Sequence, residues 1–462
     1  MQNELVKRIY RLIKENNTLR ETNELLQTRL NAVVDENEEF KTKFEELKDQ
    51  ALLAHKNGDE SQNLRFNMVT ILFGYIHGFS KITDNSDSKA LMDMLDSLMY
   101  QLNSIIDKYG ILRIKTIGDS LMCAGGIPQK NITNPVDVVM AAIEMHQAVE
   151  DCQNQMKGEK IWDIKVGIHT GPVTANISGG KKTTYDLKGE SVNIATRIES
   201  SSEIGKILIS ANTYELVKEF FTCELFGKMP IKYTGDIDLY TVHGLLPELS
   251  DNGMKTVPNS MFFTRFGLIQ FTDIQELILD KLEKELPPYL YYHNVKHTVD
   301  VVTEVELIGW GEGCNDEEIL LLKTAALFHD AGHVVGYDNH EQFGTEIARE
   351  MLPKYKYSKE QINRICEIIM ATKLPPRPKN LLEEIICDSD LDYLGRTDFI
   401  PVSNTLYREL KEQNKIGSLN DWNKLQIKFI SGHQYFTKTA RSLREVNKQK
   451  QIERITALID PE

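Results

Sequence analysis

The sequence is poor in cysteine, and none of its cysteines is paired at the spacing of a metal knuckle or redox motif. Six cysteines are scattered over 462 residues, and no CxxC pair occurs. This usage is typical of free thiols in a reducing compartment. The chain also lacks an apolar run long enough to span a membrane, and its N-terminus has no signal-peptide core. These absences predict a cytoplasmic protein without a membrane segment.

Basic residues are also in short supply. Lys and Arg number 54 against 68 Asp and Glu, which gives a net charge of -14. Proteins that bind nucleic acids need basic patches, so this balance disfavours a nucleic-acid partner. A phosphate-bearing substrate stays compatible with it, because a bound metal ion supplies local positive charge. A length of 462 residues predicts two or three domains.

The first 55 residues contain neither glycine nor proline and repeat apolar residues in a 4-3 pattern. One seam position holds Leu5, Leu12, Leu19, Leu26, Val33, Phe40 and Leu47. The other holds Ile9, Asn16, Asn23, Leu30, Asn37, Phe44 and Ala51. Leucines at one position and asparagines at the other are typical of a coiled coil of two parallel helices, because a buried Asn fixes register and oligomer number. The pattern predicts a parallel coiled-coil homodimer.

The composition then changes twice along the chain. Short β-type runs alternate with helical stretches as far as residue 245. The expected strands include residues 68–73, 111–115 and 163–168, and the expected helices are 87–109, 135–155 and 191–201. Residues 246–259 are rich in Pro, Ser, Asp, Asn and Gly, and the pattern is helical from Thr272 onward. We expect a multidomain chain with a coiled coil (1–55), an α/β domain (64–245), a linker (246–271) and an all-α domain (272–462).

Three motifs in the middle region stand in a specific order. They are residues 115–122 (KTIGDSLM), 167–173 (GIHTGPV) and 184–200 (TYDLKGESVNIATRIES). With them, residues 66–245 resemble the catalytic domain of class III nucleotide cyclases. The resemblance implies a ferredoxin-like α/β fold that works as a dimer, with nucleotide sites shared between partners. It also implies two metal-binding aspartates, and Asp119 matches the second of them.

The resemblance is incomplete at the first metal-binding position. Tyr75 stands where the family has Asp, in Phe73-Gly74-Tyr75-Ile76-His77-Gly78-Phe79. A phenol is a poor Mg²⁺ ligand, because Mg²⁺ prefers carboxylates. Losing one of two metal-binding groups removes electrostatic stabilisation of the transition state. The place of the family's phosphate-binding Lys is taken by Thr234, or by Lys232 if the alignment is shifted.

The nucleotide-recognition positions match the family. Lys115 and Asp186 match the pair that hydrogen-bonds adenine in adenylyl cyclases. Asn193 and Arg197 match the pair that orients ribose and stabilises charge in the transition state. Three interpretations follow: a degenerate domain that binds Mg-ATP or a related nucleotide for regulation, an active cyclase, or a dimerisation domain alone.

Five of the eleven histidines fall within 48 residues of the last region. His293 and His297 are four residues apart, which places both on one face of an expected helix. His329 and Asp330 end an apolar run, and Gly332 follows, where we expect the chain to turn sharply. Asp390 is expected near the start of another helix. Imidazoles and carboxylates from separate helices are what a divalent ion needs when it activates water.

This order resembles the HD phosphohydrolase superfamily over residues 286–400, and Tyr-His-Asn-x-x-His-x-x-Asp-Val is similar to the signature of cyclic-nucleotide phosphodiesterases. The resemblance implies metal ligands, with Asp330 bridging two ions and His293 as general acid. The implied ligands are His297, His329, Asp330 and Asp390. Asp388 is the rival for the last position.

Further residues are candidates for supporting roles. His333 and His340 are candidates for a second metal ion or for substrate phosphate, or are ordinary hydrogen-bonded histidines. Asp300 or Glu304 is the expected hydrogen-bond partner of a ligating imidazole. The sequence does not distinguish among Zn, Mn, Fe, Mg and Ni as the metal, because His and Asp sites accept all of them to various degrees. The resemblance implies two ions in the site. Residues 375–378 (PPRP) predict a rigid loop, which could border a pocket.

The sequence thus predicts a cytoplasmic homodimer with a metal-dependent phosphohydrolase activity on a small-molecule nucleotide, cyclic AMP or a relative. ATP or a related nucleotide bound by the cyclase-like domain would regulate it. The alternatives are a bifunctional enzyme that also makes cyclic AMP from ATP, and a nucleotide-sensing scaffold without catalysis.

Overall fold

The structure is a computed structural model that describes residues 61–77, 88–155, 162–178, 184–231 and 235–459. The expected coiled coil at 1–55 lies outside these ranges and stays a prediction, as does the homodimer that it would form. The stretch from 232 to 234, with both candidates for the phosphate-binding Lys, also lies outside them. Within the described ranges, no helix combines the length and apolar character needed to cross a bilayer.

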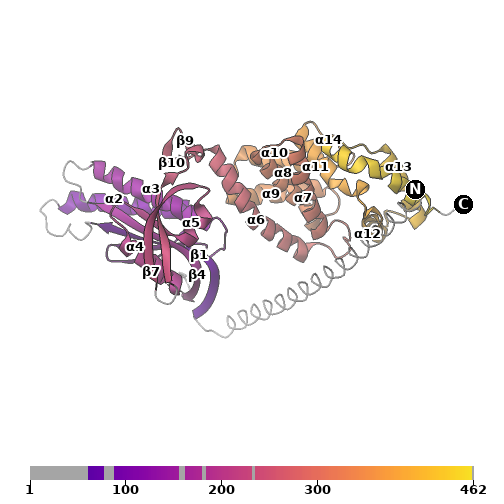
Figure 1. The fold of residues 1–462 in the computed structure, drawn as a ribbon. Coiled ribbons are helices and arrows are strands. Elements are labelled where there is room, and N and C mark those ends of the chain that lie inside the picture. Colours follow the sequence, from indigo (N-terminus) through magenta and orange to yellow (C-terminus); the bar gives the residue numbers. More distant parts are fainter. Residues whose placement is uncertain (1–60, 78–87, 156–161, 179–183, 232–234, 460–462) are drawn as a thin grey trace, which may run out of the picture. The chain divides into compact units, whose positions relative to one another are not determined.

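The first part is an α/β domain built on one eight-stranded sheet (Figure 1). Its strands are β1 (Ser61–His77), β2 (Leu112–Ile117), β3 (Ser120–Gly125), β4 (Asp163–Ser178), β5 (Thr184–Lys188), β6 (Ile207–Ser210), β7 (Phe221–Ile231) and β8 (Gly235–Leu245). The order is β2-β3-β1-β4-β6-β8-β7, with β5 paired to β4. The α/β architecture expected from alternating β-type and helical runs is confirmed.

Four helices accompany these strands: α2 (Ser88–Lys108), α3 (Asn134–Gln155), α4 (Glu190–Ser201) and α5 (Ala211–Val217). Figure 1 shows α2 and α3 side by side against the sheet. Their apolar residues join those of the strands in one core, in which Leu98, Leu102, Val139 and Trp162 are fully buried. Burial of such side chains from both layers fixes the helices on the sheet.

The stretch expected as a linker is more ordered than its composition indicated. A short two-stranded sheet, β9 (Ser250–Asp251) with β10 (Met254–Pro258), precedes helix α6 (Ser260–Glu285). The Asn259 side chain caps α6 by accepting a hydrogen bond from the backbone N–H of Phe262. Residues 260–271 are therefore helical and not linker-like, because this cap and buried apolar residues such as Phe266 stabilise them.

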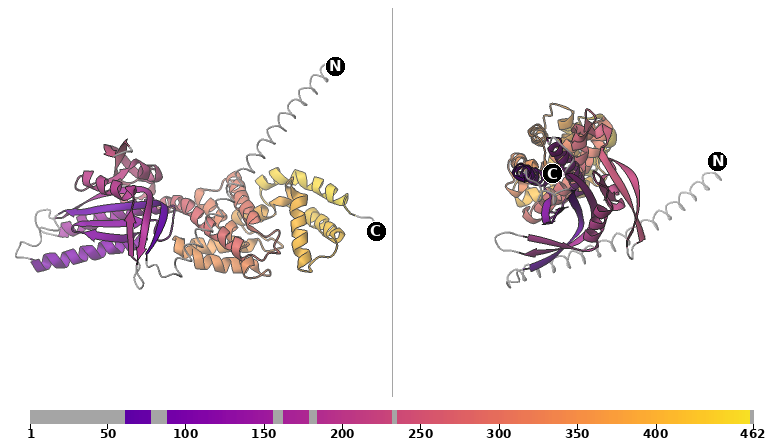
Figure 2. Two further views of the ribbon diagram at one scale, coloured as in Figure 1. Left: turned by 90° about the horizontal axis from the view of Figure 1, so that it is seen from below. Right: turned by 90° about the vertical axis from the view of Figure 1, so that its left-hand side faces the viewer.

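The remainder is helical, as expected from residue 272 onward, and Figure 2 shows these helices packed on one another. They are α7 (Val295–Glu312), α8 (Asp316–Phe328), α9 (His340–Met351), α10 (Lys359–Ala371), α11 (Leu381–Asp390), α12 (Phe399–Glu412), α13 (Leu419–Gly432), α14 (Lys438–Ala440) and α15 (Val446–Thr456). α8 is the central element, because nine of its residues are buried. The C-terminal end of α8, where His329 and Asp330 lie, is therefore held firmly by packing.

Candidate metal centre

The histidine-rich segments converge at the start of α7 and the end of α8. Asn294 caps α7 by accepting a hydrogen bond from the backbone N–H of His297 at 3.2 Å. The cap places His293 just before the helix and His297 in its first turn, so the expectation that both lie on one helix face was wrong. His329 is the C-terminal cap of α8, and Asp330 follows it. The four implied ligands thus come from α7, α8 and α11, as the sequence predicted.

Two groups of ligand-type side chains are close enough to hold an ion each. In the first, Nε2 of His297 lies 3.1 Å from Oδ1 of Asp390, and Nε2 of His329 lies 3.6 Å from the same oxygen. In the second, the ligand-type atoms of His293, Asp330 and His333 all lie within 4.8 Å of one another, as do those of the first group. His340 joins the second group, because its ring stacks on that of His333 with centroids 4.0 Å apart.

Asp330 lies between the two groups and presents a different oxygen to each. Its Oδ2 is 3.4 Å from Nε2 of His297 and 3.3 Å from Nε2 of His329. Its Oδ1 is 3.4 Å from Nε2 of His340 and 3.9 Å from Nε2 of His333. This is the arrangement that a carboxylate bridging two cations requires.

Unsatisfied polar atoms at the centre support a fit to metal ions. Among the residues that the structure describes, Oδ2 of Asp330 and both ring nitrogens of His333 are buried without a hydrogen-bond partner. Burying such atoms unpaired costs about 1–3 kcal/mol each. Imidazole nitrogen and carboxylate oxygen suit Zn²⁺ and neighbouring divalent transition metals. The donor set therefore fits one divalent ion in each group.

Backbone carbonyls, and not acidic side chains, orient two of the imidazoles. Nδ1 of His329 lies 2.7 Å from the carbonyl oxygen of Ala326, and Nδ1 of His340 lies 3.0 Å from that of Tyr337. A carbonyl only accepts, so each Nδ1–H donates, and in the neutral ring the Nε2 lone pair faces the centre.

The partners expected from the sequence were wrong. The Asp300 carboxylate accepts from Arg396 at 2.9 Å, and that of Glu304 accepts from Arg444 at 3.3 Å. Both carboxylates point toward arginines from later segments, Arg396 before α12 and Arg444 before α15, and no local spacing links these residues to α7. They therefore stabilise the packing of α7, and the imidazoles of His329 and His340 are oriented by backbone carbonyls instead.

Glu409 of α12 is a residue that sequence reasoning missed. Its carboxylate is fully buried and lies 2.5 Å from Nδ1 of His293. It also accepts from the backbone N–H groups of Tyr292 at 2.9 Å and His293 at 3.1 Å. No local motif marks this Glu, and only the packing of α12 brings it to the site.

The charges of the centre depend on one another. Burial works against the charged imidazolium of His329, but Asp330 and Asp390 beside it raise its pKa well above the ordinary value. Burial also works against an ionised Asp330, and His329 followed by His293 lowers its pKa well below the usual range. His333 is different, because burial lowers its pKa to about 3. A neutral His333 ring is the form that can ligate a metal.

The structure distinguishes the two candidates for the last ligand. Asp388 is fully buried, and its carboxylate accepts from the backbone N–H groups of Phe436 at 2.9 Å and Thr437 at 2.8 Å. Its hydrogen bonds are therefore used in packing, whereas Asp390 faces His297. Asp390 is the last residue of α11 and not near a helix start, because Asn380 already caps that helix.

Gly332 serves a close approach and not the expected sharp turn. Its φ is not in the left-handed region. A Cβ at this position would lie 1.9 Å from the carbonyl oxygen of His340 and 2.7 Å from the amide nitrogen of Gly344. Glycine therefore lets the start of α9 lie against the segment after Asp330, which brings His340 to the centre.

The cyclase-like domain presents a partial second site. Tyr75 on β1 pairs with Ser120 on β3, and the N–H of Ile76 donates to the carbonyl of Asp119 at 3.0 Å. Tyr75 thus lies on the strand beside Asp119. Its ring lies 5.4 Å from Nζ of Lys165.

The nucleotide-recognition residues lie on three elements. Lys115 is on β2 and Asp186 on β5, and both are exposed. Asn193 and Arg197 are exposed one turn apart on α4. The spacing of four residues puts this last pair on one face of the helix.

Comparisons with known proteins agree with this division. Residues 61–244 match the family model described as the adenylate and guanylate cyclase catalytic domain, and residues 294–394 match that of the HD domain. The chain is 31% identical to guanylate cyclase 32E of Drosophila melanogaster over 206 residues, which are 44% of this chain and 18% of that protein. It is 27% identical to an adenylate cyclase of Mycobacterium bovis over 188 residues, which are 40% of this chain and 42% of that protein.

Among solved structures, the chain is similar to the adenylyl cyclase CyaB from P. aeruginosa, with 30% identity and a TM-score of 0.36 over 39% of this chain and 95% of that one. The chain spans only 18% of the length of the first curated relatives. It carries a class III adenylate/guanylate cyclase catalytic domain followed by an HD domain.

Proposed function

We propose that the HD domain is a metal-dependent phosphohydrolase that cleaves a cyclic nucleotide such as cyclic AMP, or a related nucleotide phosphoester. The observation that carries the proposal is Asp330, whose two oxygens face two separate histidine groups at 3.3–3.4 Å. A buried His-Asp pair that served packing alone would not gather five histidines and a second carboxylate around one aspartate.

In this proposal His297, His329 and Asp390 would hold one ion, His333 and His340 would hold the other, and Asp330 would serve both. His293, which also belongs to the second group, is assigned to proton transfer and not to metal binding. Divalent ions bound there would polarise the phosphoryl oxygen and lower the pKa of water. Hydrolysis also needs a proton on the leaving oxygen. The chain itself provides that proton from His293.

His293 is suited to general acid catalysis by its contact with Glu409. Burial works against the charged ring, but the Glu409 hydrogen bond and then Asp330 raise the pKa of His293. Since the proton of Nδ1 is held by Glu409, Nε2 carries the proton that can be given away. An acid held in this way contributes about 10²–10⁴-fold to a rate.

The cyclase-like domain is proposed to bind ATP or a related nucleotide and to regulate the HD domain. Lys115, Asp186, Asn193 and Arg197 support nucleotide binding, since all four are exposed. Tyr75 argues against full cyclase activity, because it leaves Asp119 without the second carboxylate.

A panel of cyclic nucleotides, nucleotides and phosphodiesters tests the proposal. Purified chain is incubated with Mn²⁺, Zn²⁺ or Mg²⁺, with and without ATP, and the products are separated by chromatography. We expect cleavage of one or more cyclic nucleotides and loss of that cleavage in Asp330→Ala. If metal-loaded protein cleaves no phosphoester, the scaffold interpretation replaces the enzyme.

Bifunctional synthesis and degradation is the second candidate, and the intact Asp119 and adenine-recognition pair favour it. Incubating Asp330→Ala with ATP and Mn²⁺ separates the two, because the degrading activity is then absent. Accumulation of cyclic AMP would support a bifunctional enzyme, and its absence would leave the cyclase-like domain a regulatory role.

A further inference from the structure

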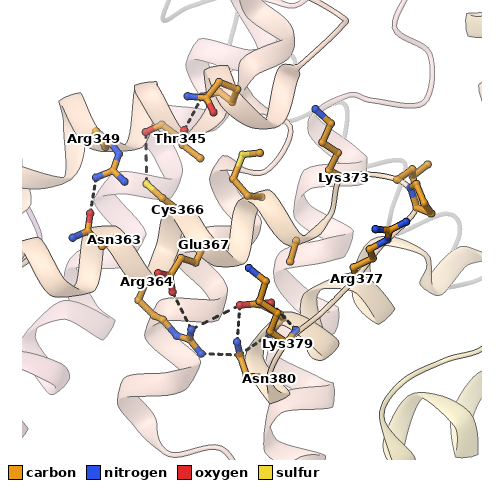
Figure 3. A pocket seen from close by; sticks show the side chains of 16 residues that line it. Thr345, Arg349, Asn363, Arg364, Cys366, Glu367, Lys373, Arg377, Lys379 and Asn380 are labelled. Atoms are coloured by element: carbon orange, nitrogen blue, oxygen red, sulfur yellow. Dashed lines mark hydrogen bonds and ion pairs between the residues drawn. The ribbon is translucent and has the colours of Figure 1, made fainter.

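A cavity of 840 Å³ lies apart from the metal centre in the helical domain (Figure 3). It is bordered by α9, α10, the loop before α11 and the first residues of α11. No histidine or aspartate of the metal centre lines it. Its size falls within the range of about 300–1,000 Å³ typical of small-molecule sites.

The cavity has an excess of positive charge in a protein with a net charge of -14. Its lining includes the cations Arg349, Arg364, Lys373, Arg377 and Lys379, against the acids Glu367 and Glu383. Five cations against two acids leave the lining with an excess of three positive charges. Arg364 is the cation that pairs with both acids, because NH1 lies 3.1 Å from Glu367 and 3.8 Å from Glu383. Four cations are therefore left without a carboxylate partner among the described residues.

The contacts of these four cations are neutral or absent. Arg349 donates to the Asn363 amide oxygen at 2.7 Å, and Lys373 donates to that of Asn339 at 3.3 Å. In the part of the chain that the structure describes, the charged groups of Arg377 and Lys379 have no hydrogen-bond or ion-pair partner. Figure 3 shows Lys373 and Arg377 on the right, Lys379 lower and beside Asn380, and Arg349 on the left.

The lining also includes apolar residues from the end of α10 and from the loop after it. They are Met370, Ala371, Leu374 and Pro375, and together they are called the apolar wall. Leu374 is 58% exposed, although it is a large apolar residue at the rim of a cavity. An apolar wall beside several uncompensated cations suits a ligand with a flat apolar ring and more than one phosphate.

We propose that this cavity is a second nucleotide site, which binds a nucleoside polyphosphate separately from the metal centre. The phosphates contact Arg349, Lys373, Arg377 and Lys379, and the base lies against the apolar wall. Lys373 also donates to Asn339, the residue before His340, so this cation connects the cavity with the start of α9. The site does not depend on the proposed hydrolase activity.

Hydrogen-exchange mass spectrometry of the full chain tests this site locally. The protein is treated with EDTA, so that metal-held phosphate does not contribute, and is then exposed to ATP, tripolyphosphate or adenosine. We expect ATP to slow exchange in residues 372–380, tripolyphosphate to do so less, and adenosine not to do so. Equal protection by tripolyphosphate would overturn the base contact.

The matched variants are Arg377→Gln/Lys379→Gln and, as control, Lys354→Gln/Lys359→Gln, which removes the same charge outside the cavity. Loss of two charge-assisted contacts should weaken ATP binding at least about tenfold in the first variant. The control should bind as the unaltered chain does. Protection that is absent in the unaltered chain, or equal in both variants, would refute the site. All four positions are exposed, and a thermal melt checks that each variant folds.

Discussion

The bridging role of Asp330 makes a specific prediction for Asp330→Asn. The substitution keeps the shape of the side chain but removes the charge that both histidine groups share. Each of its oxygens lies 3.3–3.4 Å from a ring nitrogen, so a neutral amide weakens both ion sites together. We expect the unaltered chain to hold two ions and Asp330→Asn to hold none after dialysis.

The size of the effect follows from the position of Asp330 at the centre. Outer partners of metal ligands typically change affinity by about 10–100-fold when mutated. Loss of a charged ligand that two ions share should lower the affinity for each ion at least ~100-fold. At about 1.4 kcal/mol per tenfold, that is at least ~3 kcal/mol per ion.

The comparison variants are His333→Gln and Asp390→Asn, each of which touches one group only. Metal content is measured by mass spectrometry after dialysis against a weak chelator, and a melt in excess chelator checks the fold. We expect each comparison variant to lose one ion. If Asp330→Asn retains two ions, or if all three variants lose the same number, the bridging interpretation is wrong.

Three further predictions concern other residues. Glu409→Gln should leave the metal content unchanged and slow hydrolysis by about 10–100-fold. It should also move the alkaline limb of the pH–rate profile to lower pH, because the pKa of His293 is no longer raised by a carboxylate. An unmoved limb would assign Glu409 to packing alone. Tyr75→Asp is tested with Mn²⁺-ATP on the Asp330→Ala background. It should raise cyclic nucleotide synthesis at least about tenfold, because Asp119 gains a second carboxylate beside it. An unchanged rate would mean that other groups limit synthesis by the cyclase-like domain. Burial lowers the pKa of His169 from 6.5 to about 4, so between these values the unfolded chain binds a proton that the folded chain does not. The free energy of unfolding should therefore fall by about 2 kcal/mol from pH 7 to pH 5. If urea denaturation of His169→Gln shows an equally steep fall, this reasoning is wrong.

Local patterns identified much of the site because its signals are short-range. His293 and His297 lie on either side of the residue that caps α7, and His329 and Asp330 lie at the end of α8. One helix cap and one helix end are therefore enough to place these four groups. The division into an α/β part and a helical part followed from the change in hydrophobic period, which reflects how each element buries its apolar face.

Other features depend on contacts between distant segments, and these the sequence did not reveal. Glu409 meets His293 across 116 residues, and no spacing rule links them. Because Asn380 caps α11, that helix begins early and Asp390 lies at its end. The carbonyl oxygen of His340 lies so close to Gly332 that only a residue without a side chain fits there. Arg396 and Arg444 donate to Asp300 and Glu304, the acids that were expected to accept from a ligating imidazole.

The amino-acid order by itself determined the domain types and which imidazoles and carboxylates are available, because motifs and periodicity act over a few residues. Tertiary structure decided how those groups are shared: which oxygen of Asp330 faces which histidines, which acid holds His293, and where four cations gather beside α10. Such arrangements depend on how helices pack, and packing is set by the burial of apolar faces along the whole domain.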